Sequence, residues 1–275
     1  MNFRRPSQLV IIKEEKSDHA CYRTHLATLP ECWEVSGMRH VLKQLKKRSD
    51  RPAVHFCNVS SAKAINYLRK AKASGLNVTC DTAPHYLFFT SEDVKDGGTD
   101  FKDFPPIREP MNRGFLIELL TLGQIDVLSS HHAFVTPEVK FLATGNFKRA
   151  VPGVNCIENS LRAAWTTLAK YREFNQEVLE LDLVRLAQIM CLNPAKVLGL
   201  ADRYGSLEAG KVASFIVWKP FEKAFVNFME FEFSRTNLYK GLWLFGAISA
   251  VYVRGQPAYV GGQQFPVGSR VRRAC

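Results

Sequence analysis

The sequence has no long apolar run, which argues against a membrane-spanning helix. Such a helix needs about 20 consecutive apolar residues. The longest candidate, residues 241–253, is shorter and is followed by Arg254. We interpret this stretch as a buried strand pair or core segment, and we expect no membrane partner.

Paired cysteines and export signals are also missing. The seven cysteines are widely spread and none forms a Cys-x-x-Cys pair, so a zinc ribbon is not supported. An odd number of scattered cysteines is typical of reduced thiols. Residues 1–12 are basic but carry no secretory signal, and the last three residues are not a peroxisomal signal. We expect an intracellular, cytoplasmic location, and a mitochondrial address stays open.

Acidic residues are fewer than basic ones, 26 against 37, which gives a formal net charge of +11. A basic chain can bind nucleic acid. However, the basic run at residues 43–48 lies on a predicted helix whose other face carries Val41, Leu42 and Leu45. No aromatic residues alternate with the basic ones, as they do in RNA-binding motifs. We interpret the run as a solvated helix surface and expect no nucleic-acid partner.

Strand-like and helix-like segments alternate through most of the 275 residues, of which 46% are hydrophobic. This alternation predicts an α/β fold with a parallel sheet, in which ligands bind at the carboxyl ends of the strands. One large domain or two small ones fit this length. The predicted strands are residues 7–13, 52–59, 76–81 and 125–130, and the predicted helices are residues 32–48, 60–75, 110–123, 157–174 and 181–200.

The pattern changes near residue 205. An apolar run at residues 215–218 is followed by a predicted strand, a tight turn at Arg254–Gly255 and another strand. We therefore predict two parts, an α/β portion at residues 1–204 and a small β-rich segment at residues 205–275.

Several stretches together resemble the cyclic amidohydrolases, a family that includes dihydroorotase, dihydropyrimidinase and allantoinase. The motif "PPIRE" followed by "TPEVKFLATGNF" is most similar to the allantoinase branch. The resemblance implies a (β/α)8 barrel with a small β-sandwich, and hydrolysis of allantoin to allantoate by two zinc ions that activate a bridging hydroxide. It is carried by residues 22–34, 59–94, 104–153, 193–218 and 251–259.

The same resemblance places the beginning of this chain near the fifth barrel strand. We therefore expect a partial (β/α)8 TIM barrel, about strands 5 to 8 with their helices, and an N-terminally truncated, degenerate relative of the family. The family's His-x-His pair and carboxylated lysine belong to earlier strands. No two histidines of this chain are separated by a single residue.

The later ligand positions of the family are all changed here. Lys13 and Asn58 stand where the fifth and sixth strands carry histidines, and His131 stands at the place of the catalytic aspartate. A lysine ammonium has no lone pair, and an amide is a poor ligand for zinc. Histidine cannot supply the anionic oxygen of an aspartate. His131 is thus the one candidate catalytic residue, and we expect no metal cofactor in this chain.

The family's substrate-facing region corresponds here to His85, Pro105 and Gly153. We expect His85 to shape the pocket wall or to fix a loop. Phe104 adds bulk just before Pro105. Pro152 replaces one glycine of a pair and removes a backbone donor.

Whether the chain is an enzyme stays open at this point, because several hypotheses fit. One hypothesis is an inactive allantoinase-like protein, which binds allantoin only if residual binding survives. Another is a truncated product without a stable fold. Alternatively, it is an interaction module whose unpaired barrel strands join a second copy or a partner chain. A hydrolase with a rebuilt metal site would use His131 and His132 with Cys156 or Glu138.

Overall fold

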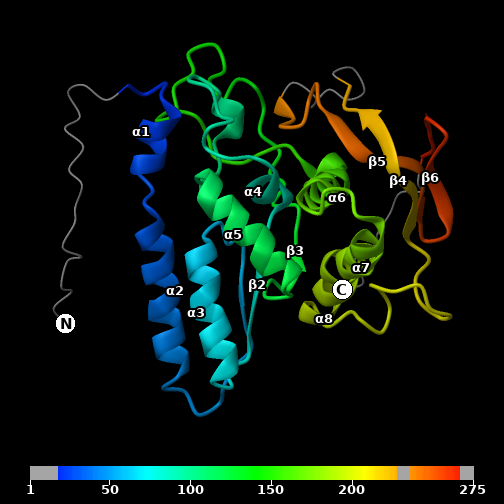
Figure 1. Cartoon of the computed structure of the whole chain (residues 1–275), viewed down its shortest axis with the longest axis horizontal. Helices are drawn as coiled ribbons and strands as arrows, with labels where there is room; N and C mark the ends of the chain where they lie inside the picture. The colour runs from blue at the N-terminus through cyan, green and yellow to red at the C-terminus, as the bar shows by residue number, and fades with distance from the viewer. Residues whose placement is uncertain (1–17, 228–235, 267–275) are drawn as a thin grey trace, which may run out of the picture.

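Three short parallel strands form the sheet around which the first part of the chain is built (Figure 1). The computed structural model describes residues 18–227 and 236–266. The strands lie in the order β1-β2-β3. Their bounds are β1 (Val54–Phe56), β2 (Val78–Thr82) and β3 (Val127–Leu128). The α/β class and three of the predicted strands are confirmed, and the predicted strand at residues 7–13 lies outside the described residues.

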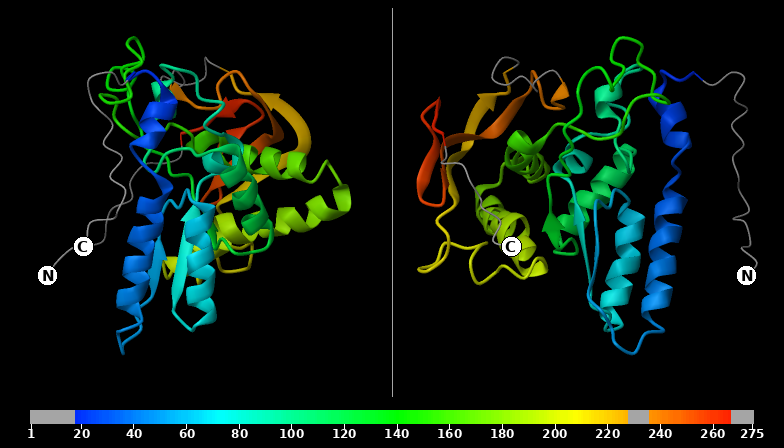
Figure 2. Two further views of the ribbon diagram at one scale, coloured as in Figure 1. Left: turned by 60° about the vertical axis from the view of Figure 1, so that its left-hand side comes forward. Right: turned by 180° about the vertical axis from the view of Figure 1, so that it is seen from behind.

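Helices precede, connect and follow these strands. Helices α2, α3 and α5 pack side by side next to the sheet (Figures 1 and 2). No helix within the described residues is long and apolar enough to cross a membrane. The helices are α1 (Tyr22–Ala27), α2 (Glu31–Leu45), α3 (Ala62–Ala73), α4 (Pro84–Phe88), α5 (Pro110–Thr121), α6 (Ser160–Tyr171), α7 (Gln176–Ala187) and α8 (Asn193–Val197), with a π-helical turn at Gln188–Leu192 and 3-10 turns at Thr99–Phe101 and Ile157–Asn159.

Helix α3 shows how the sequence sets its own boundaries. The Ser61 hydroxyl accepts a hydrogen bond from the Ala64 backbone N–H at 3.0 Å, which caps the first turn. Gly75 follows the last turn with a φ of +81°, a conformation that glycine adopts without strain. Ile65 and Leu68 are fully buried on the face toward the core.

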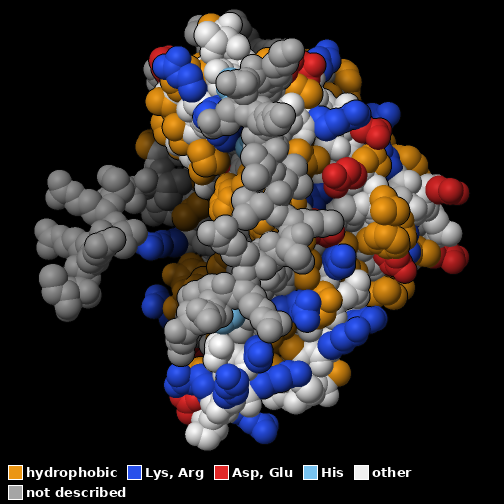
Figure 3. Space-filling view, turned by 90° about the vertical axis from the view of Figure 1, so that its left-hand side faces the viewer, with side chains coloured by type: hydrophobic (Ala, Val, Ile, Leu, Met, Phe, Trp, Pro, Cys, Tyr) orange, Lys and Arg blue, Asp and Glu red, His pale blue; other side chains and the backbone are white. Residues whose placement is uncertain are grey.

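In helix α2 one residue predicted on the apolar face is exposed. Leu42 and Leu45 are buried as expected, but the side chain of Val41 is 39% exposed. The buried face is therefore narrower than predicted. Figure 3 shows the Lys and Arg side chains gathered at the lower end of this side of the molecule.

The last part of the described chain is a four-stranded antiparallel sheet in the order β4-β5-β6-β7. Arg254 and Gly255 form the tight turn between β5 and β6, and both have a positive φ. Trp165 of α6 is fully buried and donates its indole N–H to the Pro220 carbonyl at 2.6 Å. This sheet therefore packs on α6, and the boundary near residue 205 stays a prediction. The strands are β4 (Phe215–Phe225), β5 (Trp243–Val253), β6 (Gln256–Val260) and β7 (Gln263–Gln264).

Candidate functional site

A buried carboxylate, Asp103, gathers three side chains at the carboxyl ends of β2 and β3. Its Oδ2 atom lies 2.8 Å from His85 Nε2 and accepts a hydrogen bond from the Tyr86 hydroxyl at 3.1 Å. His131 Nε2 lies 3.2 Å from the same oxygen, within ion-pair distance but without hydrogen-bond geometry. We call these four residues the Asp103 cluster.

The parallel sheet brings these residues together. Strand β2 ends at Thr82, and the short helix α4 begins at Pro84, so that His85 and Tyr86 lie in its first turn. Strand β3 ends shortly before His131, whose φ is +47°. The carboxyl ends of neighbouring parallel strands lie at one edge, which is where α/β proteins place ligands. The Asp103 cluster therefore occupies the expected site edge.

The charge states of Asp103 and His131 depend on each other. Burial alone would raise the pKa of Asp103, but His131 and His85 together hold it well below its ordinary value. Burial alone would lower the pKa of His131, but the Asp103 carboxylate and the Phe104 backbone outweigh this effect and raise it. The nearby carboxylate thus shifts the pKa of His131 upward and the two histidines shift that of Asp103 downward. An imidazolium has no lone pair with which to ligate a metal.

The predicted substrate-facing residues adjoin the same cluster. The Pro105 carbonyl accepts the Tyr86 hydroxyl at 2.7 Å, and the Gly153 backbone N–H donates to the Lys102 carbonyl at 3.0 Å. The structure thus brings His85, Pro105, Gly153 and His131 around the segment Lys102–Asp103. A role in substrate binding stays a prediction, since the contacts seen here hold the protein to itself.

Only a glycine fits at position 153. Its φ is +122°, and a Cβ atom built there would lie 2.8 Å from the Cβ of Ala133. Any larger residue would force the two segments apart. Phe104, on the other side of this region, is 61% exposed.

Sequence reasoning missed the residues at the centre of this site. Asp103 was hidden in "KDFPPIRE", where the following prolines drew more notice. Lys140, which is 1% exposed, donates from Nζ to the Lys102 carbonyl at 2.8 Å. Burial lowers the pKa of Lys140 to about 8, although Asp103 and Asp100 oppose this. For Lys140, the available signal was a single lysine next to the apolar residues Val139, Phe141 and Leu142.

Within the described residues, His132 and Cys156, two residues of the predicted rebuilt metal site, bond to the protein itself. His132 Nδ1 accepts the Cys156 backbone N–H at 3.1 Å, and the Cys156 thiol donates to the Ser130 carbonyl at 3.1 Å. Burial raises the pKa of Cys156 to about 12. The Cys156 thiol is therefore already bonded within the protein.

Asn58, at another family ligand position, contacts Asp81 through its backbone N–H. Its N–H donates to Asp81 Oδ1 at 2.6 Å, and its φ is +57°. Lys13, the remaining position, lies outside the described residues. Within residues 18–227 and 236–266, the one group of three His, Cys, Asp or Glu residues close enough to share a metal ion is formed by His55, Cys57 and Asp81.

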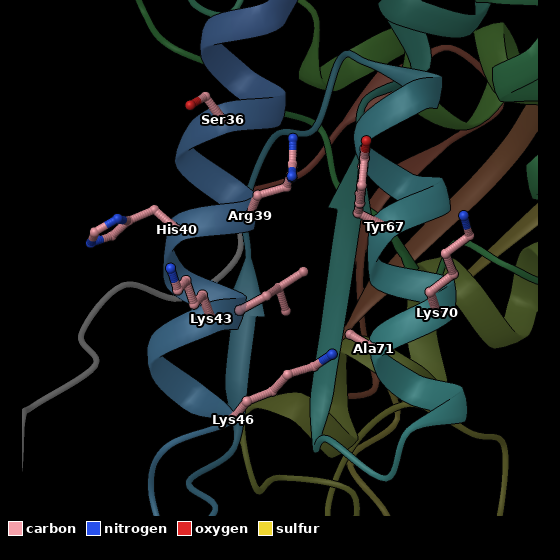
Figure 4. Close-up of a pocket in the computed structure, with 9 residues that line it drawn as sticks. Ser36, Arg39, His40, Lys43, Lys46, Tyr67, Lys70 and Ala71 are labelled. Carbon is pink, nitrogen blue, oxygen red and sulfur yellow. The ribbon is translucent and has the colours of Figure 1, made fainter. Parts of the chain in front are cut away.

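A basic groove lies elsewhere, between the outer sides of α2 and α3 (Figure 4). It has a volume of about 600 Å³, and Arg39 lies over the ring of Tyr67 at 5.2 Å from its centre. Lys43 and Lys46 line it, and both are exposed, as expected for a solvated helix surface. The groove is formed by helices away from the strand ends and adds nothing to the Asp103 cluster.

Comparison with known proteins agrees with this α/β fold. The sequence pattern of the amidohydrolase family matches residues 115–258, just over half of the chain. The chain therefore belongs to the amidohydrolase family.

Within that family the chain is allantoinase-like. It is 31% identical to an allantoinase of Arabidopsis thaliana over 257 residues, covering 90% of this chain and 49% of that protein. It is 35% identical to an allantoinase of Streptomyces avermitilis, covering 88% of this chain and 52% of that protein. The chain thus spans about half the length of these relatives.

Solved structures show the same fold. The L-hydantoinase (dihydropyrimidinase) of Arthrobacter aurescens superposes with a TM-score of 0.79 at 24% identity, over 89% of this chain and 52% of that one. The D-hydantoinase of a Thermus species superposes with a TM-score of 0.74 at 23% identity, over 86% and 50%. These likenesses concern the fold alone.

Proposed function

We propose that this chain is a non-hydrolysing allantoinase-like protein. In this proposal it forms about strands 5 to 8 of an amidohydrolase barrel with a small β-rich segment. The Asp103 cluster stands where the family reaction needs its catalytic aspartate. Allantoin is then at most a ligand of the chain and is not its substrate.

The ion pair between His131 and Asp103 carries this proposal. In the family reaction an aspartate at this place moves a proton to the leaving nitrogen. Here the residue is His131, and the buried Asp103 carboxylate 3.2 Å away raises its pKa and so favours the cation. A cation there neither ligates a metal nor accepts the proton that the attacking water must lose.

The described residues do not fit the family's pair of zinc ions. Asn58 offers only an amide side chain, and zinc prefers imidazole and thiolate ligands. His131 offers no lone pair while it is protonated. No hydrolytic step through a zinc pair follows from these residues.

A direct assay tests the proposal. The full chain is incubated with allantoin and added Zn²⁺ or Mn²⁺, and formation of allantoate is followed. The Streptomyces avermitilis relative serves as a control under the same conditions. We expect no turnover above the protein-free rate. Turnover that is lost in the variant His131→Asn would contradict the proposal.

A second candidate function is pairing with another chain. Among the described residues β1 is an end strand of its sheet, because it pairs with β2 alone. An edge with free backbone groups is a template for strand pairing. A second copy of this chain is the occupant that we propose, in place of the strand predicted at residues 7–13, which would pair with β1 in the arrangement of strands 5 to 8.

Sedimentation of the full chain over a range of concentrations tests this pairing. We expect a monomer–dimer equilibrium, weakened when proline replaces His55 in β1, because proline cannot donate to a strand partner. A monomer at all concentrations would rule out the second copy as a partner.

A further inference from the structure

Three potential metal ligands meet at the carboxyl ends of β1 and β2, outside the Asp103 cluster. They are His55, Cys57 and Asp81, and their ligand atoms all lie within 4.8 Å of one another. Imidazole, thiolate and carboxylate are the three ligand types that zinc takes in proteins.

The strand alternation explains why the three side chains share one face. Cys80 is fully buried in the apolar core beside α3, so its neighbours Thr79 and Asp81 point to the opposite side of the sheet. His55 pairs in register with Thr79, and Cys57 follows two residues later on the same face. The group therefore lies away from the helix-covered core.

Each of the two less exposed ligands is already oriented by a neighbour. His55 Nδ1 lies 2.8 Å from the Thr79 hydroxyl, which leaves Nε2 directed at the group. The Asn58 backbone N–H holds Asp81 Oδ1 at 2.6 Å, which leaves Oδ2 directed there. Such partners fix the rings and carboxylates of real metal sites in place.

The spacing of the ligand atoms also fits one ion. His55 Nε2 and Asp81 Oδ2 are 3.0 Å apart and share a hydrogen bond that a metal ion would replace. Two such ligands on a tetrahedral zinc ion are about 3.3 Å apart, given zinc–ligand distances of about 2.0–2.1 Å. A thiolate and a carboxylate together would balance the charge of a divalent cation.

The group of His55, Cys57 and Asp81 is partly exposed to solvent, which leaves room for a fourth ligand. The side chain of Asp81 is 8% exposed and that of His55 is 20% exposed, whereas Cys57 lies at the surface. Three protein ligands with an open fourth position are typical of zinc sites that keep a water molecule.

We propose that His55, Cys57 and Asp81 bind a single zinc-like divalent cation. This site goes beyond the proposed function, because it uses none of the positions that the family reaction uses. Absence of allantoin hydrolysis therefore neither supports nor opposes it. The alternative is the hydrogen bond between His55 Nε2 and Asp81 Oδ2 alone, with no metal.

Titration of the full chain with Co²⁺ distinguishes these alternatives, because a cobalt–thiolate bond gives an intense near-ultraviolet absorption. We expect this band to saturate at one cobalt per chain and to be displaced by Zn²⁺. The variant Cys57→Ser should lose the band. The matched control Cys32→Ser, which alters another exposed cysteine, should keep it.

A second variant tests the His55 ligand and leaves the Cys57 thiol in place. Thr79→Val removes the partner of His55 and should weaken cobalt binding about 10- to 100-fold while the band keeps its shape. Circular dichroism checks that each variant is folded. If the native chain gives no band, or if the band survives in Cys57→Ser, binding is adventitious and the proposed site is wrong.

Discussion

At the scale of single residues, the chemistry of this chain turns on position 131. The allantoinase resemblance expects an aspartate there, and the chain has a histidine. The structure adds that a carboxylate is present after all, on Asp103, and that it faces His131 at 3.2 Å. A single change at position 131 would therefore place two carboxylates side by side, and it would not by itself rebuild the family site.

Reversion of one partner should therefore destabilise the protein. His131→Asp puts a second carboxylate against the buried Asp103, and breaking a buried ion pair costs about 3–5 kcal/mol. Urea unfolding should show a loss of about that size. The exchanged pair His131→Asp with Asp103→His should recover much of it. A variant His131→Asp as stable as the native chain would show that the pair contributes nothing.

His25 gives a pH prediction. It is buried, its ring stacks on Phe147 with centroids 5.3 Å apart, and burial together with Lys102 and Lys140 lowers its pKa to about 4. Between pH 4 and about 6.5 the imidazole of His25 is protonated in the unfolded chain and neutral in the folded chain. Stability should thus fall as the pH is lowered through this window.

The variant His25→Phe keeps the stacking and removes the titration. It should gain on the order of 1–2 kcal/mol relative to the native chain at pH 5, after solvent screening is allowed for, and much less at pH 8. Denaturant unfolding at both values measures the difference. An equal effect at the two values would show that His25 titrates normally.

At the scale of elements, local patterns predicted boundaries well. Ser61 caps α3, Gly75 follows its end, and Arg254–Gly255 form the hairpin turn, all as the sequence indicates. Each of these rests on the conformational preference of one residue, which acts locally. Val41 was misplaced because a helical stripe in the sequence does not state how wide its buried face is.

The buried face of α3 should dominate its stability. Leu68 is fully buried in the core, and Leu→Ala changes at such sites cost about 2–5 kcal/mol. Thermal unfolding of Leu68→Ala should show this loss. Lys70→Ala, on the exposed face of the same helix, should change stability by less than about 0.5 kcal/mol. Similar losses in both variants would contradict this orientation of the helix.

At the scale of the whole molecule, the sequence indicated the α/β class and the place of the site edge but not the contacts at it. Asp103 meets His85 and His131 only because β2, β3 and the loop after the Thr99–Phe101 turn converge there. The group of His55 and Asp81 likewise depends on how β1 pairs with β2. Strand pairing joins residues that are far apart in the chain, and a single sequence does not state it.

The protonation state of His131 in the full chain tests the central claim most directly. A nuclear magnetic resonance titration with labelled histidine, assigned by comparison with His131→Asn, gives its pKa. We expect a pKa above the ordinary value of about 6.5, which falls when Asp103 is changed to Asn. A His131 pKa at or below the ordinary value, unchanged in Asp103→Asn, would show a neutral imidazole free to ligate a metal and would contradict the claim.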